Sequence, residues 1–218
     1  MTNRDRSGRA GGRPKKELFV SVDIEADGRI PGRNSMLSFG SAAFTLDKEL
    51  VGFYSANLET LPGAEGDPET MEWWRSQPEA WAACRQDPVD PAQAMPDYVE
   101  HLASLKAAHG RPTFIGYPVA FDFGWMNWYL HRFAGRNPFG ISGLCLKSFA
   151  AARLECPFQA ATKRNFPRRW FDRLRHSHVA LADAVEQGAM GINMIREGRG
   201  LPPVDGILNK TELDLGAL

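Results

Sequence analysis

Long apolar segments are missing from this 218-residue sequence. No run approaches the ~20 apolar residues that a membrane-spanning helix needs, and the basic, polar N-terminus lacks the apolar centre of a secretory signal. Cysteine is also scarce, because only three occur and no two have the close spacing of a zinc knuckle or a redox motif. These absences predict a cytoplasmic protein whose thiols stay reduced.

Net charge is absent too, since 26 basic and 26 acidic residues cancel. The composition, 43% apolar and 24% charged, excludes a collagen-like, coiled-coil or wholly disordered chain. The charge is uneven, because residues 1–16 hold six basic residues and one acid, which leaves the remainder acidic. An acidic body argues against broad, nonspecific duplex binding, but it supplies the carboxylates that a divalent-cation site needs.

Composition divides the chain into three regions. Residues 1–16 have almost no apolar side chains, which predicts a disordered basic tail. Residues 17–198 are expected to form one domain, because a chain of this length fits a single core. Residues 199–218 are interrupted by proline and glycine, which predicts a loosely packed C-terminal tail.

Within the domain, strand-like runs come first and helices follow. Strands are predicted at 18–25, 36–45, 51–58 and 113–117, and helices at 68–75, 78–84, 91–109, 121–133, 144–153 and from 178 or 179 to 196. The first three strands follow one another closely and predict an antiparallel meander. The later alternation of helices and strands predicts a mixed α/β domain whose sheet is flanked by helices.

Two carboxylates stand at the end of the first predicted strand. Side chains alternate between the two faces of a strand, so Asp23 and Glu25 point the same way. Two like charges at this separation repel each other unless a positive charge lies between them, and a divalent cation is the usual one. The alternative is a solvated strand end, because pairs of acids at this spacing are common.

Three further residues later in the chain suit the same chemistry. Asp122 follows the fourth predicted strand, where it either joins the carboxylates or stabilises a helix N-terminus. His178 and Asp183 converge only if His178 lies in the loop that enters the last helix, for which Ser177 is the predicted N-cap. The alternatives are a surface histidine and a solvated helix acid. Glycines inside this helix predict a close approach to a neighbouring backbone.

The order of these residues resembles the DEDD superfamily of 3′–5′ exonucleases, in its histidine subclass (DEDDh). This DnaQ-like group contains RNase T, oligoribonuclease and proofreading exonucleases. The resemblance covers roughly residues 18–196, and it implies an RNase H-like α/β fold with a five-stranded mixed sheet, in which parallel strands join the meander. It assigns Asp23, Glu25, Asp122, His178 and Asp183 as the motif residues.

The resemblance also implies a mechanism. Two divalent cations, Mg²⁺ or Mn²⁺, would activate water and relieve charge on the leaving oxygen. Asp23 would lie between the ions, Glu25 and Asp183 would hold the ion that binds the attacking water, and Asp122 would support the other. His178 would accept the proton of that water. The implied substrate is the 3′ end of single-stranded RNA or DNA, with RNA favoured by analogy with RNase T, and the products are nucleoside 5′-monophosphates.

The residues themselves leave two functions possible besides the exonuclease. One is a noncatalytic module that binds nucleic-acid ends on the same fold, and the presence of all five motif residues argues against it. The other is an endonuclease of the RNase H kind, which the pairing of His178 with Asp183 disfavours. A homodimer is implied only by analogy with relatives.

The residues that contact substrate are less well defined. Many relatives follow the first-motif glutamate with two threonines and a glycine, whereas this chain has Ala26, Asp27 and Gly28, which makes Asp27 a turn former. Gly28 and Phe123 are candidates for bordering the nucleotide. A basic stretch precedes the third motif, and its candidates for gripping phosphates are Lys163, Arg164, Arg168 and Arg169, followed by Arg173 and Arg175. This stretch either binds the strand or forms a solvated loop or a subunit contact.

Paired aromatic residues and scattered histidines complete the candidates. Trp73 and Trp74 either stack on a base or belong to the core, which is the commoner role of such a pair. The remaining histidines have no acid at a useful spacing, so no role is assigned to His101, His109, His131 or His176.

Overall fold

The computed structural model describes residues 17–174 and 176–209 of the chain. The predicted basic tail at 1–16, Arg175 of the basic stretch and the end of the predicted C-terminal tail, 210–218, lie outside the described residues. In the described part of the chain, no helix combines the length and the apolar character needed to cross a membrane.

One mixed β-sheet forms the centre of the fold, as predicted. Its strands are β1 (Leu18–Ala26), β2 (Met36–Thr45), β3 (Glu49–Asn57), β4 (Pro112–Gly116), β5 (Gly143–Cys145) and β6 (Leu208–Asn209), in the order β5-β4-β1-β2-β3-β6. β1 to β3 form the antiparallel meander, and β4 and β5 add to β1 in parallel. These strands give the predicted five-stranded sheet, and the two-residue β6 extends it in parallel beyond β3.

Six α-helices occur in the described part of the chain, and proline begins the first three. They are α1 (Pro68–Arg75), α2 (Pro78–Cys84), α3 (Pro91–His109), α4 (Val119–Ala134), α5 (Leu146–Arg153) and α6 (Ala180–Gly198). The first three have the predicted bounds, because each has Pro at its first position, and Asp67 and Asp90 cap α1 and α3 through their side chains. The helix predicted over 144–153 is partly wrong: its first residues form β5, which pairs with β4 before α5 begins.

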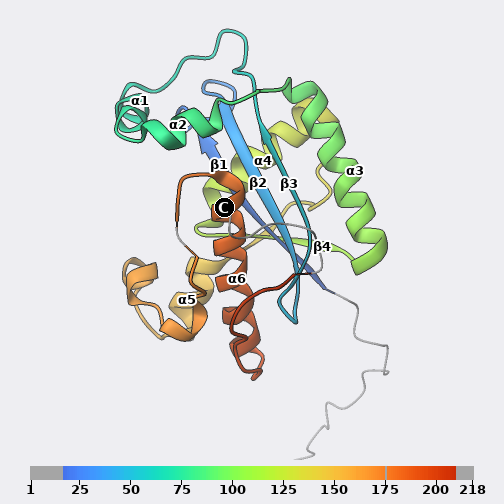
Figure 1. The fold of residues 1–218 in the computed structure, drawn as a ribbon, viewed down its shortest axis with the longest axis vertical. Helices are drawn as coiled ribbons and strands as arrows, with labels where there is room; N and C mark the ends of the chain where they lie inside the picture. Colours follow the sequence, from blue (N-terminus) through green and yellow to red (C-terminus); the bar gives the residue numbers. More distant parts are fainter. Residues whose placement is uncertain (1–16, 175, 210–218) are drawn as a thin grey trace, which may run out of the picture.

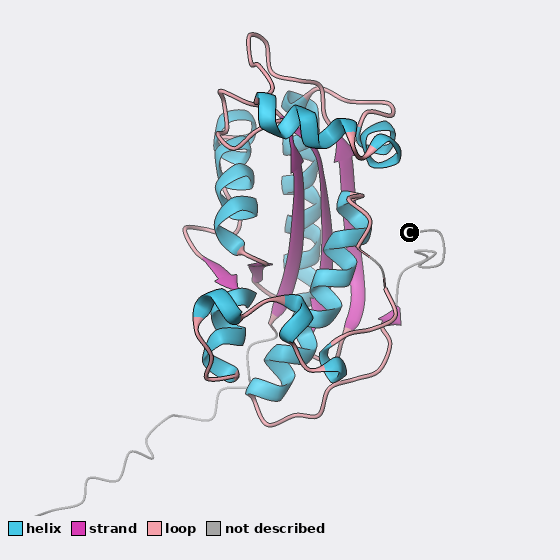
Figure 2. Cartoon of the chain, turned by 90° about the vertical axis from the view of Figure 1, so that its left-hand side faces the viewer, coloured by secondary structure: helices cyan, strands magenta, loops and turns pink. Residues whose placement is uncertain are grey.

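The sheet lies between two helical layers. Val20, Val22 and Ile24 of β1 belong to a core shared with α3 and α4, whereas Phe19 belongs to a second core shared with α5 and α6. Figure 1 shows α6 in front of the sheet and α4 behind it, and Figure 2 shows the strands between the helices after a 90° turn. The alternation of β1 therefore sends its odd-numbered side chains, including Asp23 and Glu25, toward α6.

Two glycines allow α6 to lie close to the sheet, as its composition predicted. A Cβ at Gly188 would lie 2.4 Å from the ring of Phe44 on β2. A Cβ at Gly40 of β2 would lie 2.3 Å from the backbone of Ala180, the first residue of α6. Both distances are shorter than atoms tolerate, so glycine at these positions brings the first turn of α6 directly against the meander.

Hydrogen bonds attach the residues after α6 to the domain as far as residue 209, although none of residues 199–208 is buried. The amide of Val204 donates to Asn193 Oδ1 at 2.8 Å, and its carbonyl accepts from Lys48 Nζ at 2.7 Å. Lys48 is fully buried and also pairs with Asp172 at 2.7 Å. Buried polar groups need partners, and this segment supplies them, which is a long-range requirement that its own proline and glycine content does not reveal.

Candidate active site

The carboxyl ends of the parallel strands β1 and β4 meet at one edge of the sheet, and the candidate residues gather there. Asp23 and Glu25 end β1 on the face covered by α6. Asp122 comes from the first turn of α4, just after β4, and is buried. The ends of parallel strands are the usual place for ligands in α/β folds. Gly116 leaves space here, since a Cβ on it would lie 3.2 Å from Asp122 Oδ2.

Asp183 reaches the same point from the first turn of α6. One oxygen of each carboxylate of Asp23, Glu25 and Asp183 lies within 4.8 Å of the others. Asp183 is 1% exposed, and Asp122 is close enough to act electrostatically on Asp23. The two predicted acids of β1 and the acids of two helices therefore form one cluster.

His178 lies in the loop before α6, which is the condition that its convergence with Asp183 required. The helix begins at Ala180, and His178 has a left-handed backbone with φ of 58°. The amide of His178 donates to Asp183 Oδ2 at 2.8 Å, and its ring Nδ1 lies 4.0 Å from Glu25 Oε1. Asp183 thus holds the loop that presents the imidazole to the carboxylates.

The predicted cap of α6 is wrong. The N-cap residue is Val179, and Ser177 instead donates its amide, at 2.7 Å, and its hydroxyl, at 3.3 Å, to Asp183 Oδ1. The reason is the geometry of the loop: the left-handed turn at His178 moves Ser177 away from the helix amides and toward the side chain of Asp183.

Burial and mutual repulsion disfavour ionisation of this cluster. Burial, with the charges of Asp183 and Asp122, raises the pKa of Glu25 to about 8. Burial and the neighbouring acids, Asp122 first among them, also raise the pKa of Asp23 well above its usual range. Burial opposes ionisation of Asp183 as well, but hydrogen bonds from His176 and the loop amides outweigh it and lower the pKa of Asp183.

The donor set fits hard divalent cations. Three carboxylates converge, Asp122 lies beside them, and all the candidate donor atoms are oxygens, which Mg²⁺ and Mn²⁺ prefer. Charge supports the same conclusion, because repelling carboxylates are stabilised by a cation among them. Lys163 is the one cation that offsets the charge of Asp23 in the described structure, and its Nζ is already paired with Glu186.

Two residues lie near His178 in roles that the sequence did not assign to them, namely His176 and Trp73. The sequence analysis found no acid partner for His176. The structure corrects this, because Nδ1 of His176 lies 3.1 Å from Asp183 Oδ2. Trp73 makes an edge-to-face contact with the His178 ring, at 5.0 Å between centroids, and is 39% exposed. Trp74 is core instead, and its Nε1 donates to the Ala26 carbonyl at 3.0 Å. The His-x-His spacing before Asp183 was the signal for His176. The tryptophan pair marked Trp73 as a candidate for stacking on a base, but no local pattern indicated its contact with His178.

A glutamine on α6 links the elements that carry the acids. Gln187 Nε2 donates to Ser21 Oγ at 3.0 Å and to the Val22 carbonyl at 3.1 Å, both on β1. Its Oε1 accepts from the amide of Tyr117, after β4, at 2.8 Å. Gln187 follows Asp183 by one helical turn on the same face, a spacing that could have singled it out in the sequence.

The predicted substrate contacts are only partly brought together. Gly28 is buried against the side chain of Asn34, and Phe123 packs edge-to-face on Phe114 in the core. Of the basic stretch, Lys163 lies near the acids. Arg169 pairs instead with Glu197, through bonds of 2.5 and 3.0 Å. Three exposed arginines of the stretch make no ion pair with a described residue: Arg164, Arg168 and Arg173.

Replacing Glu25 with glutamine should stabilise the metal-free protein at pH 8. A carboxyl whose pKa is raised to about 8 in the folded state ionises first in the unfolded state, so stability falls as pH rises from ~4.5 toward 8. The variant does not lose stability in this way, so with chelator its melting temperature should exceed that of the wild type by several degrees. A change of ~1 kcal/mol in the free energy of unfolding shifts the melting temperature by ~2–4 °C in a protein of this size.

Thermal melts at pH 5 and pH 8 measure this effect. The gain should shrink at pH 5, and Mg²⁺ should raise the melting temperature of the wild type more than that of the variant. Glu100→Gln, at an exposed site on α3, is the matched control and should show no such pH dependence. An equal gain for Glu25→Gln at both pH values would contradict the electrostatic explanation.

Known proteins were compared with the sequence and the fold. No protein-family model matches the sequence. A curated relative, the 3′–5′ DNA exonuclease Cap18 of Escherichia coli, is 36% identical over 137 residues, which are 62% of this chain and 69% of the relative.

Two solved structures share the fold at low identity. A 3′-exonuclease described in recognition of the 3′ end of a histone mRNA stem-loop matches with a TM-score of 0.65 and 8% identity, over 85% of this chain and 84% of that chain. The nuclease domain of 3′hExo, a DEDDh family member bound to rAMP, has a TM-score of 0.60 and 10% identity, over 90% of this chain and all of that domain. With the curated relative, they confirm the RNase H-like nuclease fold and the resemblance: the chain is a nuclease and belongs to the DEDDh family of 3′–5′ exonucleases.

Proposed function

We propose that this protein removes nucleotides one at a time from the 3′ end of single-stranded DNA and releases nucleoside 5′-monophosphates. The observation that carries the proposal is the convergence of the Asp23, Glu25 and Asp183 carboxylates within 4.8 Å of one another, with the His178 ring at their edge. Asp122 completes the set of acids. These four carboxylates are the proposed ligands of two divalent cations, Mg²⁺ or Mn²⁺.

In this mechanism the bound cations would supply an acidified water and charge neutralisation at the leaving oxygen. The chain's own part begins with His178, whose imidazole takes the proton from the attacking water. Burial, with the neighbouring His176, lowers the pKa of His178, which keeps the ring neutral and able to accept a proton at neutral pH. Asp183 contributes twice, as a ligand and as the acceptor of the loop amides that hold His178.

DNA is the proposed substrate because the curated relative, at 36% identity, is named as a DNA exonuclease. This revises the preference for RNA by analogy with RNase T. A surface hollow of ≈ 630 Å³ along α4 supports a strand path, because aromatic and cationic side chains line it, among them Arg29, Phe121, Trp128 and Arg132. Stacking on exposed rings and ion pairs with phosphates together hold single strands. A homodimer and a cytoplasmic location stay predictions.

Digestion of 5′-labelled oligonucleotides tests this proposal. Single-stranded DNA and RNA of one sequence would be incubated with Mg²⁺, with Mn²⁺ and with chelator. The expected result is a ladder of DNA that shortens by one nucleotide from the 3′ end, is lost with chelator and forms faster than the RNA ladder. Cuts in circular single strands would indicate an endonuclease, and binding of ends without any degradation would indicate a noncatalytic module.

Trp73 is proposed to position His178, and its removal should lower kcat about tenfold or more with little change in KM. The indole edge supports one side of the imidazole, and a misplacement of ~1 Å in a catalytic group can cost ~10²-fold. Trp73→Phe keeps an aromatic ring and should restore most of the rate that Trp73→Ala loses. If Trp73→Ala raises KM alone, Trp73 contacts the substrate rather than positioning the base.

A further inference from the structure

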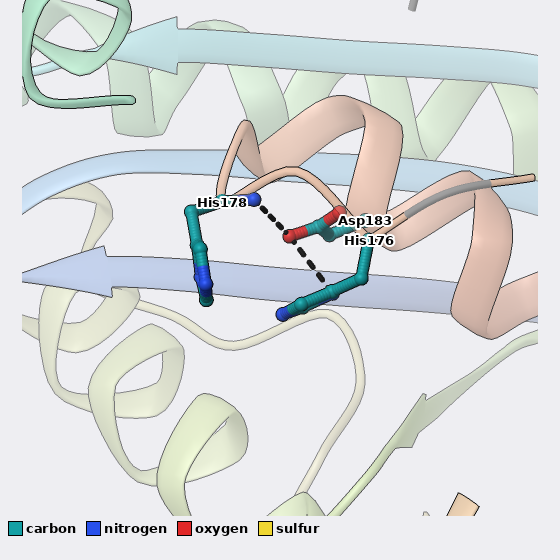
Figure 3. A group of neighbouring side chains, drawn as sticks. All are labelled: His176, His178 and Asp183. Atoms are coloured by element: carbon teal, nitrogen blue, oxygen red, sulfur yellow. Dashed lines mark hydrogen bonds and ion pairs between the residues drawn. The ribbon is translucent and has the colours of Figure 1, made fainter. Parts of the chain in front are cut away.

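A second group of metal-binding side chains lies beside the carboxylate cluster. His176 and His178 come from the loop before α6, and Asp183 comes from its first turn. One ligand atom from each lies within 4.8 Å of the other two, and the imidazole centroids are 4.5 Å apart with the rings at 75°. Figure 3 shows the two rings approaching each other next to the Asp183 carboxylate.

The donors of this group differ in kind from those of the carboxylate cluster. Two imidazole nitrogens, which are borderline ligands, together with one carboxylate oxygen suit Zn²⁺, Co²⁺ or Ni²⁺, whereas Mg²⁺ prefers oxygen alone. Three protein ligands with a fourth position open to water are a common arrangement for Zn²⁺. We propose that His176, His178 and Asp183 form a binding site for Zn²⁺ or a chemically similar transition-metal ion, which overlaps the carboxylate cluster at Asp183.

The group is accessible to an ion from solvent. The His176 side chain is 50% exposed and that of His178 is 33% exposed, whereas Asp183 is 1% exposed behind them. The loop that carries both rings is already fixed by its hydrogen bonds to Asp183, at 2.7 Å from the Ser177 amide and 2.8 Å from the His178 amide. Little chain ordering is therefore needed when an ion binds, which favours affinity.

Occupancy of this site would inhibit the enzyme, a consequence that rests on the proposed function. An ion on the His178 ring takes the lone pair that would otherwise accept the proton of water, and it shares Asp183 with the carboxylate cluster. Micromolar Zn²⁺ should therefore suppress activity even in millimolar Mg²⁺, because Mg²⁺ does not compete well for imidazole.

The absorption spectrum of Co²⁺ tests the site without any measurement of activity. Co²⁺ would be titrated at pH 8 into the full chain and into His176→Gln, which keeps a hydrogen-bond donor for Asp183 but removes an imidazole. The wild type should give one intense tetrahedral visible band that Zn²⁺ displaces. The variant should lose the band or bind Co²⁺ at least roughly 10–100-fold more weakly, since loss of an outer-shell partner alone has that effect.

His109→Gln, at a partly exposed site in the last turn of α3, is the matched control and should give the wild-type titration. A weak octahedral spectrum that His176→Gln leaves unchanged would overturn the site, because the ion would then be among the carboxylates. Zn²⁺ inhibition, normalised to the zinc-free rate of each variant, should also weaken in His176→Gln. A protein that gives the tetrahedral band but has no nuclease activity would retain this site and reject the proposed function.

Discussion

Asp23→Ala should lower the rate of 3′-end hydrolysis by at least ~10³-fold while the protein remains folded. Loss of one preorganised electrostatic group costs ~10²–10³ in kcat, and Asp23 is the acid on which Asp122, Glu25 and Asp183 all act. Without Asp23, the remaining acids provide too few carboxylate oxygens to hold the two proposed cations. The loss should be in kcat, because Asp23 is a proposed ligand of the cations that would act on the reacting phosphate.

A digestion time course with 5′-labelled single-stranded DNA measures this effect. Asp23→Asn removes the charge with almost no change of shape, and it should be nearly as inactive as the alanine variant. Asp97→Ala, at an exposed position on α3, is the control and should retain the wild-type rate. Both Asp23 variants should be more thermostable than the wild type in chelator, because a buried repulsion is relieved. A rate above about a tenth of wild type in Asp23→Ala would reject the proposed cation site.

His178→Ala should have the second largest effect, a loss of ~10²–10⁴ in kcat, which is the usual contribution of a general base. Its predicted signature differs from that of Asp23→Ala because the carboxylates remain. Nδ1 of His178 is 4.0 Å from Glu25 Oε1, so the ring lies at the edge of the acid cluster rather than inside it. Mn²⁺ affinity, measured by calorimetry, should therefore change little.

The pH dependence of kcat distinguishes a proton acceptor from a structural residue. The wild-type rate should fall at acidic pH as His178 becomes protonated, with a midpoint below the usual range of histidine, because burial and His176 lower the pKa of His178. In His178→Ala this limb should disappear and the residual rate should rise with hydroxide concentration. An unchanged acidic limb, or a wild-type rate, would assign the proton acceptor to another group.

Much of the candidate site could be predicted from local patterns. The period of two in β1 placed Asp23 and Glu25 on one face, and their convergence with Asp183 is observed. Five residues of separation restricted His178 to the loop before α6, where it lies. Proline defined the starts of α1 to α3, and the aspartates before α1 and α3 cap those two helices, because these signals act within one helical turn.

Contacts between distant segments decided the rest. Adjacent tryptophans took different roles because ~100° of helix rotation separates them: Trp74 reaches the Ala26 carbonyl, and Trp73 reaches His178, more than a hundred residues later in the chain. The His176 partner, the pairing of Arg169 with Glu197 and the attachment of residues 202–208 likewise depend on which surfaces the folded sheet and α6 bring together.

The sequence by itself determined the mixed α/β class, the meander and most of the helices, since each follows from periodicity, capping or the order of elements along the chain, and its resemblance to the DEDDh exonucleases indicated the five motif residues. The tertiary structure alone decided which side chains surround His178, which of the basic residues approach the acids and how strongly each carboxyl resists ionisation. These properties depend on burial and on through-space distances between groups far apart in the chain, and a linear pattern contains neither.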